Sequence, residues 1–152
     1  MRHSQARPKR RGAAMAEVAV IGLLFLMLIM GLLDLGIGVY RYNLVCQAAR
    51  QGARQAIVHG ALAPSQIGSW GPATYGPTPA SGSNAIAVAL QPYLTGIEPS
   101  TVTIKYQWLD GDNQFGHRVQ VTVTYSYKPM MTFIFGSPTY NLGTVSTMRI
   151  AH

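Results

Sequence analysis

The longest apolar run of the chain lies near its N-terminus. Sixteen uncharged residues separate Glu17 from Asp34, and no other charge occurs in the segment 13–39. A helix needs about 20 mainly apolar residues to cross a hydrocarbon core of about 30 Å. The pattern therefore predicts a transmembrane helix over residues 13–39, with a buried helix of a water-soluble core as the alternative.

Beyond the apolar run, the pattern changes to that of an amphipathic helix over residues 40–59. Small and apolar residues recur at helical spacing on one face, and polar residues occupy the opposite face. The small face contains Val45, Ala48, Ala49, Gly52, Ala53 and Ala56, and the polar face contains Asn43, Gln47, Arg50 and Arg54. One continuous helix from Ala13 to Val58 would be about 70 Å long.

A seven-residue repeat along this helix marks candidate packing and assembly positions. It comprises Glu17, Leu24, Gly31, Gly38, Val45 and Gly52. Small residues on such a seam allow another backbone to approach closely. Either a partner helix or the chain's own sheet can pack there; we expect the partner at residues 24–38 and the sheet at residues 45–56. Asp34 either marks the outer membrane interface or binds within an assembly.

The composition changes again after the helix, because Gly, Pro, Ser and Ala dominate residues 60–83. The prolines of this segment are Pro64, Pro72, Pro77 and Pro79. Proline lacks the backbone N–H that helix interiors and central strands need, so the segment is predicted to be a surface loop. Trp70 and Tyr75 are either exposed contact residues or, as we expect, parts of a loop folded back onto the domain.

Residues 84–152 are predicted to form a small α+β domain. Ser83 or Asn84 can cap a short helix that ends at Leu90. Strict alternation of apolar and polar residues predicts strands over 101–109 and 117–128, and a last strand is expected over 140–150. The alternating apolar residues are Val102, Ile104, Tyr106 and Trp108 in the first strand, and Val119, Val121, Val123, Tyr125 and Tyr127 in the second.

The predicted fold class is therefore α+β, with a long N-terminal transmembrane helix that extends into a small extracytoplasmic domain. Its antiparallel sheet is expected to have about three strands, two of them joined by a hairpin loop over residues 110–116. The apolar run 130–135 either fills the core, as we expect, or forms a surface patch for a neighbouring subunit or the membrane.

The distribution of charge indicates the orientation in the membrane. The net charge is +7, but five of the twelve basic residues lie in the leader 1–12, and the rest of the chain is nearly balanced. Basic residues before a transmembrane segment favour a cytoplasmic N-terminus. The domain is then expected on the periplasmic or extracellular side, and the high pI gives little support to nucleic-acid binding.

The sequence contains no recognisable catalytic or metal-binding set. The four histidines lack metal-ligand spacing, and the segment 110–113 (DGDN) has the composition of a turn and lacks the later ligands of an EF-hand. The single cysteine, Cys46, cannot form an internal disulfide. We expect no cofactor, no metal and no enzymatic activity.

Several of these features, in this order, resemble the TadE-like family of tight-adherence (Tad) pilus assembly proteins. The residues that carry the resemblance are Arg11 and Gly12, Glu17, the apolar run, the DLG at 34–36, Tyr40, and the AARQGAR at 48–54. They cover about the first third of the chain. Two positions depart from the family pattern: Val18 replaces an aromatic residue, and Gly22 replaces a frequent proline.

The resemblance implies a pilin-like pseudopilin of the bacterial inner membrane that takes part in building a pilus. It also implies that a prepilin peptidase cuts the leader between Gly12 and Ala13. The carboxylate of Glu17 would then lie one helical turn from the new amine, and either neutralises this amine or a neighbouring subunit's, or simply suits the start of the helix. The expected partners are membrane lipid, the peptidase, other pilins and the pilus assembly platform. The alternative is a single-span extracytoplasmic binding or scaffold protein that is never processed.

Overall fold

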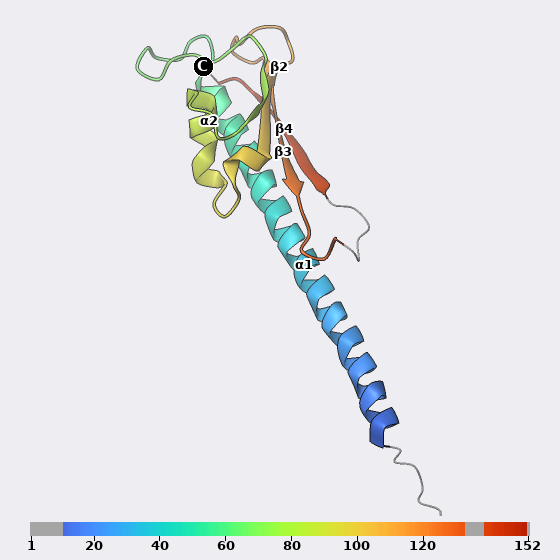
Figure 1. The fold of residues 1–152 in the computed structure, drawn as a ribbon. Helices are drawn as coiled ribbons and strands as arrows, with labels where there is room; N and C mark the ends of the chain where they lie inside the picture. Colours follow the sequence, from blue (N-terminus) through green and yellow to red (C-terminus); the bar gives the residue numbers. More distant parts are fainter. Residues whose placement is uncertain (1–10, 133–138, 152) are drawn as a thin grey trace, which may run out of the picture.

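The computed structural model describes residues 11–132 and 139–151, which form one long helix and a small sheet domain (Figure 1). The helices are α1 (Arg11–Val58) and α2 (Ala85–Leu90), followed by the 3-10 turns Gln91–Tyr93 and Pro99–Thr101. The strands are β1 (Tyr75–Pro79), β2 (Val102–Trp108), β3 (Arg118–Tyr127) and β4 (Tyr140–Arg149). The predicted α+β class is confirmed.

Helix α1 is continuous over 48 residues, as the sequence predicts. No proline interrupts it, and at its C-terminal end the imidazole Nδ1 of His59 lies 2.7 Å from the Gln55 carbonyl oxygen. The second half of α1 lies along the sheet, whereas its first half projects away from the domain (Figure 1). The two halves of one helix are therefore in different surroundings.

The sheet is antiparallel and has the order β1-β2-β3-β4. It contains four strands rather than about three, because β1 lies inside the segment 60–83 that the sequence predicts as a loop. The prolines of this strand, Pro77 and Pro79, are tolerated because β1 is an edge strand and pairs only with β2. The pairing is interrupted by a register shift between Tyr75 and Thr78, where Gly76 has a φ of +86°.

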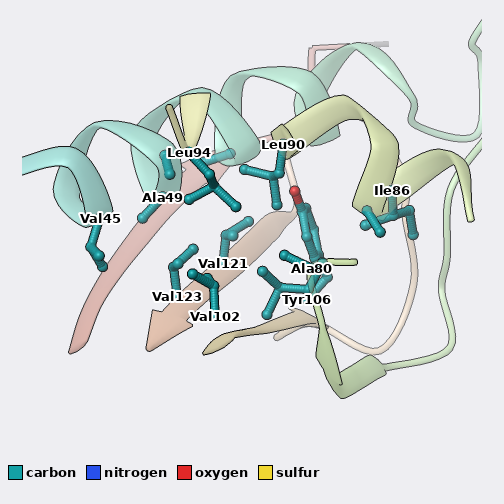
Figure 2. Close-up of a cluster of buried hydrophobic side chains, with 14 of the residues drawn as sticks. Val45, Ala49, Ala80, Ile86, Leu90, Leu94, Val102, Tyr106, Val121 and Val123 are labelled. Atoms are coloured by element: carbon teal, nitrogen blue, oxygen red, sulfur yellow. The ribbon is translucent and has the colours of Figure 1, made fainter. Parts of the chain in front are cut away.

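The core lies between one face of the sheet and the two helices (Figure 2). Every alternating apolar residue predicted for β2 and β3 is buried. The small face of α1 is buried against them, which confirms the prediction for residues 45–56; its members are Val45, Ala48, Ala49, Gly52, Ala53 and Ala56. Small side chains on α1 let the helix pack close to the sheet.

The helix that covers the end of the core begins as predicted. Asn84 is its N-cap, and the Asn84 side chain accepts a hydrogen bond of 3.1 Å from the Ile86 N–H. A cap of this kind satisfies one of the free N–H groups of the first turn. Helix α2 then buries Ile86, Ala87 and Leu90.

The segment between α1 and β1 is folded back onto the domain, as we expected for Trp70 and Tyr75. The Trp70 ring stacks on His59 with ring centroids 3.9 Å apart, and its carbonyl accepts a hydrogen bond from the buried Asn113 side chain. Tyr75 packs partly buried against the core. Trp70 therefore joins the end of α1 to the loop that follows β2.

The loop between β2 and β3 is the predicted hairpin connection. Asp110 binds the Arg118 guanidinium and also accepts a hydrogen bond from the Arg118 N–H at 2.8 Å. These bonds from Arg118 lower the pKa of the Asp110 carboxyl to about 2. Residues 110–113 therefore belong to the turn between β2 and β3.

Candidate functional site

The first half of α1 exposes most of its apolar side chains. It is the one helix, among the residues that the structure describes, that is long and apolar enough to cross a membrane, and only 6% of its most apolar 18-residue window is buried. Such a surface is much larger than the apolar patches that water-soluble monomers normally expose. The helix therefore fits a single-pass membrane anchor.

Where this exposed rod meets the domain, one carboxylate is buried. Asp34 is 3% exposed and accepts hydrogen bonds from three groups of the opposite segment. Its Oδ1 accepts from the Tyr127 hydroxyl at 2.7 Å and from the Met130 N–H at 3.1 Å, and its Oδ2 accepts from the Met131 N–H at 2.8 Å. An ionised carboxylate can only accept, so this set of donors suits it.

A cation on the next turns of the helix binds the same strand. The guanidinium of Arg41 lies 5.5 Å from the ring centroids of both Tyr125 and Tyr127, and it donates a hydrogen bond to the Tyr125 hydroxyl. Burial, followed by the hydrogen bond to Asp34, raises the pKa of Tyr127 to about 12. We call Asp34, Arg41, Tyr125 and Tyr127 the clasp, because these residues join the end of β3 to α1.

The clasp changes the interpretation of two candidate assembly residues. The sequence left Asp34 either at the outer membrane interface or bound within an assembly. The carboxylate is occupied by the chain's own domain, which argues against its use in an intermolecular contact and does not bear on the membrane-interface alternative. A Cβ placed on Gly38 would lie 3.5 Å from the Tyr127 ring, so this glycine also faces the sheet. The surface expected for a partner helix at residues 24–38 is therefore covered at Asp34 and partly covered at Gly38.

The other predicted site residues fall into two groups. Val45 and Gly52 lie in the domain core. Gly12, Ala13 and Glu17 are exposed near the start of α1, and a Cβ on Gly31 would meet no atom within 4 Å. Within the described ranges, Glu17 has no hydrogen-bond or ion-pair partner. These four positions remain accessible to another protein, whereas Asp34, Val45 and Gly52 are buried and Gly38 is partly buried.

The apolar run 130–135 is described only in part. Met130 is 84% exposed and Met131 is half-buried, while residues 133–135 lie outside the described residues. The exposure of Met130 does not fit the expected core role for that position. In residues 11–132 and 139–151, no group of three or more His, Cys, Asp or Glu side chains could hold a metal ion.

Sequence reasoning missed the role of Arg41 and the intramolecular role of Asp34. The available signal was the seven-residue spacing of Asp34 and Arg41, which places an acid and a base on one face of α1. Tyr125 and Tyr127 also share one face of their strand. Nothing in the sequence pattern states that these two faces meet.

The fold is that of a small helix-and-sheet domain carried on a single long apolar helix. The family model described as TadE-like protein matches residues 12–54, which confirms the resemblance noted from the sequence. The match lies entirely on α1 and supports a Tad pilus-associated protein. Neither curated proteins nor solved structures gave a match.

Proposed function

We propose that this chain is a minor pilin or pseudopilin, anchored in the bacterial inner membrane, that takes part in assembly of a Tad-type, type IVc-like pilus. The observation that carries the proposal is the coincidence of the family match with α1. The matched helix contains both the exposed apolar half and the half that packs in the core of the domain. In this proposal the protein acts mechanically, by inserting and packing its helix among other pilins and the assembly platform.

The clasp suggests where the lipid span ends. If Asp34 and its partners belong to the extracytoplasmic domain, the span covers residues 13–33 rather than 13–39. Twenty-one helical residues are about 31 Å long, which is close to the thickness of a hydrocarbon core of about 30 Å. The basic leader favours a cytoplasmic N-terminus, so the sheet domain would lie in the periplasm or on the assembled pilus.

Processing of the leader is the step that separates this proposal from a permanently anchored binding module. The family match begins at Gly12, the proposed last residue of the leader. Gly12 is exposed, and a Cβ there would meet no atom within 4 Å. A substitution at Gly12 can therefore change cleavage without disturbing the fold.

We expect Gly12→Ala to block trimming by the prepilin peptidase. Mass spectrometry of the membrane-bound protein should find the N-terminus at Ala13 in the parent chain and an intact leader in the variant. Gly22→Ala is the matched control, because Gly22 also lies on α1 with no atom within 4 Å of an added Cβ. An intact leader in the parent would favour the unprocessed scaffold instead, and normal trimming of Gly12→Ala would remove the assignment of the cleavage site.

Glu17→Ala should leave membrane insertion unchanged and reduce the amount of assembled pilus severalfold. After cleavage, the Ala13 amine and the Glu17 carboxylate lie one turn apart, and an unpaired charge near hydrocarbon is costly. Glu17→Gln keeps the size of the side chain and should fail in the same way, because the charge is what pairs. The measurement compares protein in membrane fractions with pili sheared from cells. Wild-type piliation by both variants would contradict the pairing.

A further inference from the structure

An apolar groove of about 400 Å³ opens beside the clasp. One wall is the α1 segment that follows Asp34, and the other comes from the end of β3 and from β4. The side chains that define the groove are Leu35, Val39 and Tyr42 of α1, together with Pro129 and Leu142. Among the described residues that line the groove, Asp34 is the one charged residue, and its carboxylate already accepts three hydrogen bonds.

The groove is continuous with the exposed apolar surface of the anchor. Leu32, Leu33 and Leu35 are each more than half exposed, so no polar interval separates the helix surface from the groove. Beside the groove, Met130 is 84% exposed, and the hydrogen bond from its N–H to Asp34 fixes it at that level of α1. Met130 follows Pro129, a lining residue of the groove, and its exposed side chain adds apolar surface next to it.

Exposed tyrosines lie in the groove and near it: Tyr42 and Tyr140 line it, and Tyr40 lies on the same stretch of α1. Tyr40 is 60% exposed, Tyr42 is 44% exposed, and Tyr140 on β4 is 38% exposed. Tyrosine is enriched where a membrane meets water, because its ring is apolar and its hydroxyl is polar. Residue 34 also lies about 31 Å along α1 from Ala13, at the expected outer boundary of the hydrocarbon.

We propose that the end of the domain next to the anchor, formed by the groove and Met130, lies in the outer interface of the bilayer. We further propose that the groove binds a phospholipid acyl chain. This inference rests on the membrane anchor of the proposed function. Three observations favour lipid as the occupant. The groove is continuous with the anchor, its charged lining residue Asp34 is already hydrogen-bonded, and exposed tyrosines lie beside it. A domain that contacts the membrane both through α1 and through this end has a restricted tilt relative to the bilayer.

The test uses the full-length chain in vesicles of phosphatidylethanolamine and phosphatidylglycerol, with or without brominated acyl chains. An environment-sensitive fluorophore is attached to Met130→Cys in a Cys46→Ser background. Leu24→Cys reports on the anchor, and Phe115→Cys, an exposed position in the hairpin loop at the other end of β3, reports on the distant surface. We expect brominated lipid to quench the probes at positions 24 and 130 but not at 115.

A second pair of variants tests the groove itself. Val39→Asp adds a charge to the groove at an exposed position, and Val145→Asp adds the same charge to an exposed position of β4 outside it. Val39→Asp should abolish quenching at position 130, whereas Val145→Asp should leave it intact. The Met131 N–H donates to Asp34 of the clasp, so slow hydrogen exchange at this amide verifies that the clasp is still formed in both variants.

The outcomes separate this inference from the proposed function. Quenching at position 24 with none at position 130 would overturn the lipid contact while keeping the anchor. Absence of quenching at position 24 would remove the anchor, and the proposed function with it. If quenching at position 130 fell as the protein-to-lipid ratio rose while position 24 stayed quenched, a second copy and not lipid would occupy the groove, which would also overturn the inference.

Discussion

Replacing Gly52 by valine is expected to destabilise the domain by about 3 kcal/mol or more. Gly52 lies where α1 packs most closely on the core: an added Cβ would lie 2.7 Å from the Tyr106 hydroxyl oxygen, 3.1 Å from Leu90 and 3.2 Å from Val121. Alanine already creates these contacts, and valine adds two methyl groups to them. Chemical unfolding followed by the fluorescence of Trp70 and Trp108 measures the loss.

Gly31→Val is the matched control, because a Cβ added at this position of the same helix would meet no atom within 4 Å. It should leave unfolding of the domain unchanged. A partial rescue is also expected: the Tyr106 hydroxyl is buried without a hydrogen-bond partner in the described part of the chain, so Tyr106→Phe costs little and relieves the contact with a Cβ at position 52. Equal stability of Gly52→Val and Gly31→Val would contradict the close packing.

Replacing Asp34 by alanine is expected to open the clasp without unfolding the core. The substitution removes the acceptor of three hydrogen bonds and leaves the Met130 and Met131 amides without their partner. Hydrogen exchange at these two amides should accelerate on the order of tenfold or more, since hydrogen bonds to charged groups are the stronger kind. The amides of the strand centre, such as those of Val121 and Val123, should keep their protection because the side chains around them are unchanged.

Asp34→Asn distinguishes the loss of charge from the loss of the acceptor. The amide oxygen can still accept from Tyr127 or Met130, but the amide nitrogen would face the Met131 N–H, and two donors cannot bond. We therefore expect exchange at Met131 to accelerate in both variants, and exchange at Met130 to accelerate less in Asp34→Asn. Unchanged exchange at both amides in Asp34→Ala would show that the clasp does not hold this end of the domain.

Asp34 of the clasp divides α1 into a part that is covered by the sheet and a part that is not. Toward the C-terminal end of the helix, the small residues are covered by the sheet; toward the N-terminal end, Gly31 and Glu17 remain uncovered. A partner helix in a pilus would therefore meet α1 mainly on the part before Asp34. This division follows from packing and agrees with the span of residues 13–33 that we propose.

Much of the fold was predictable from the sequence because it depends on neighbouring residues. The apolar run needs only consecutive residues, the burial of Val119, Val121 and Val123 follows from a period of two, and the cap at Asn84 depends on Ile86 two residues later. Strand β1 was missed for the opposite reason. Its prolines argue against a strand, and only its position at the edge of the sheet makes them acceptable.

The sequence by itself determined the long apolar helix, its small-residue face and the alternating strands, because periodicity is a property of each segment alone. The tertiary structure alone decided what Asp34 binds, since its partner Tyr127 is 93 residues away. That contact depends on where β3 ends relative to α1, which is set by the packing of the whole core between them. No local sequence pattern specifies which residues of β3 lie next to Asp34. The clasp and the groove beside it could therefore be identified only in the folded chain.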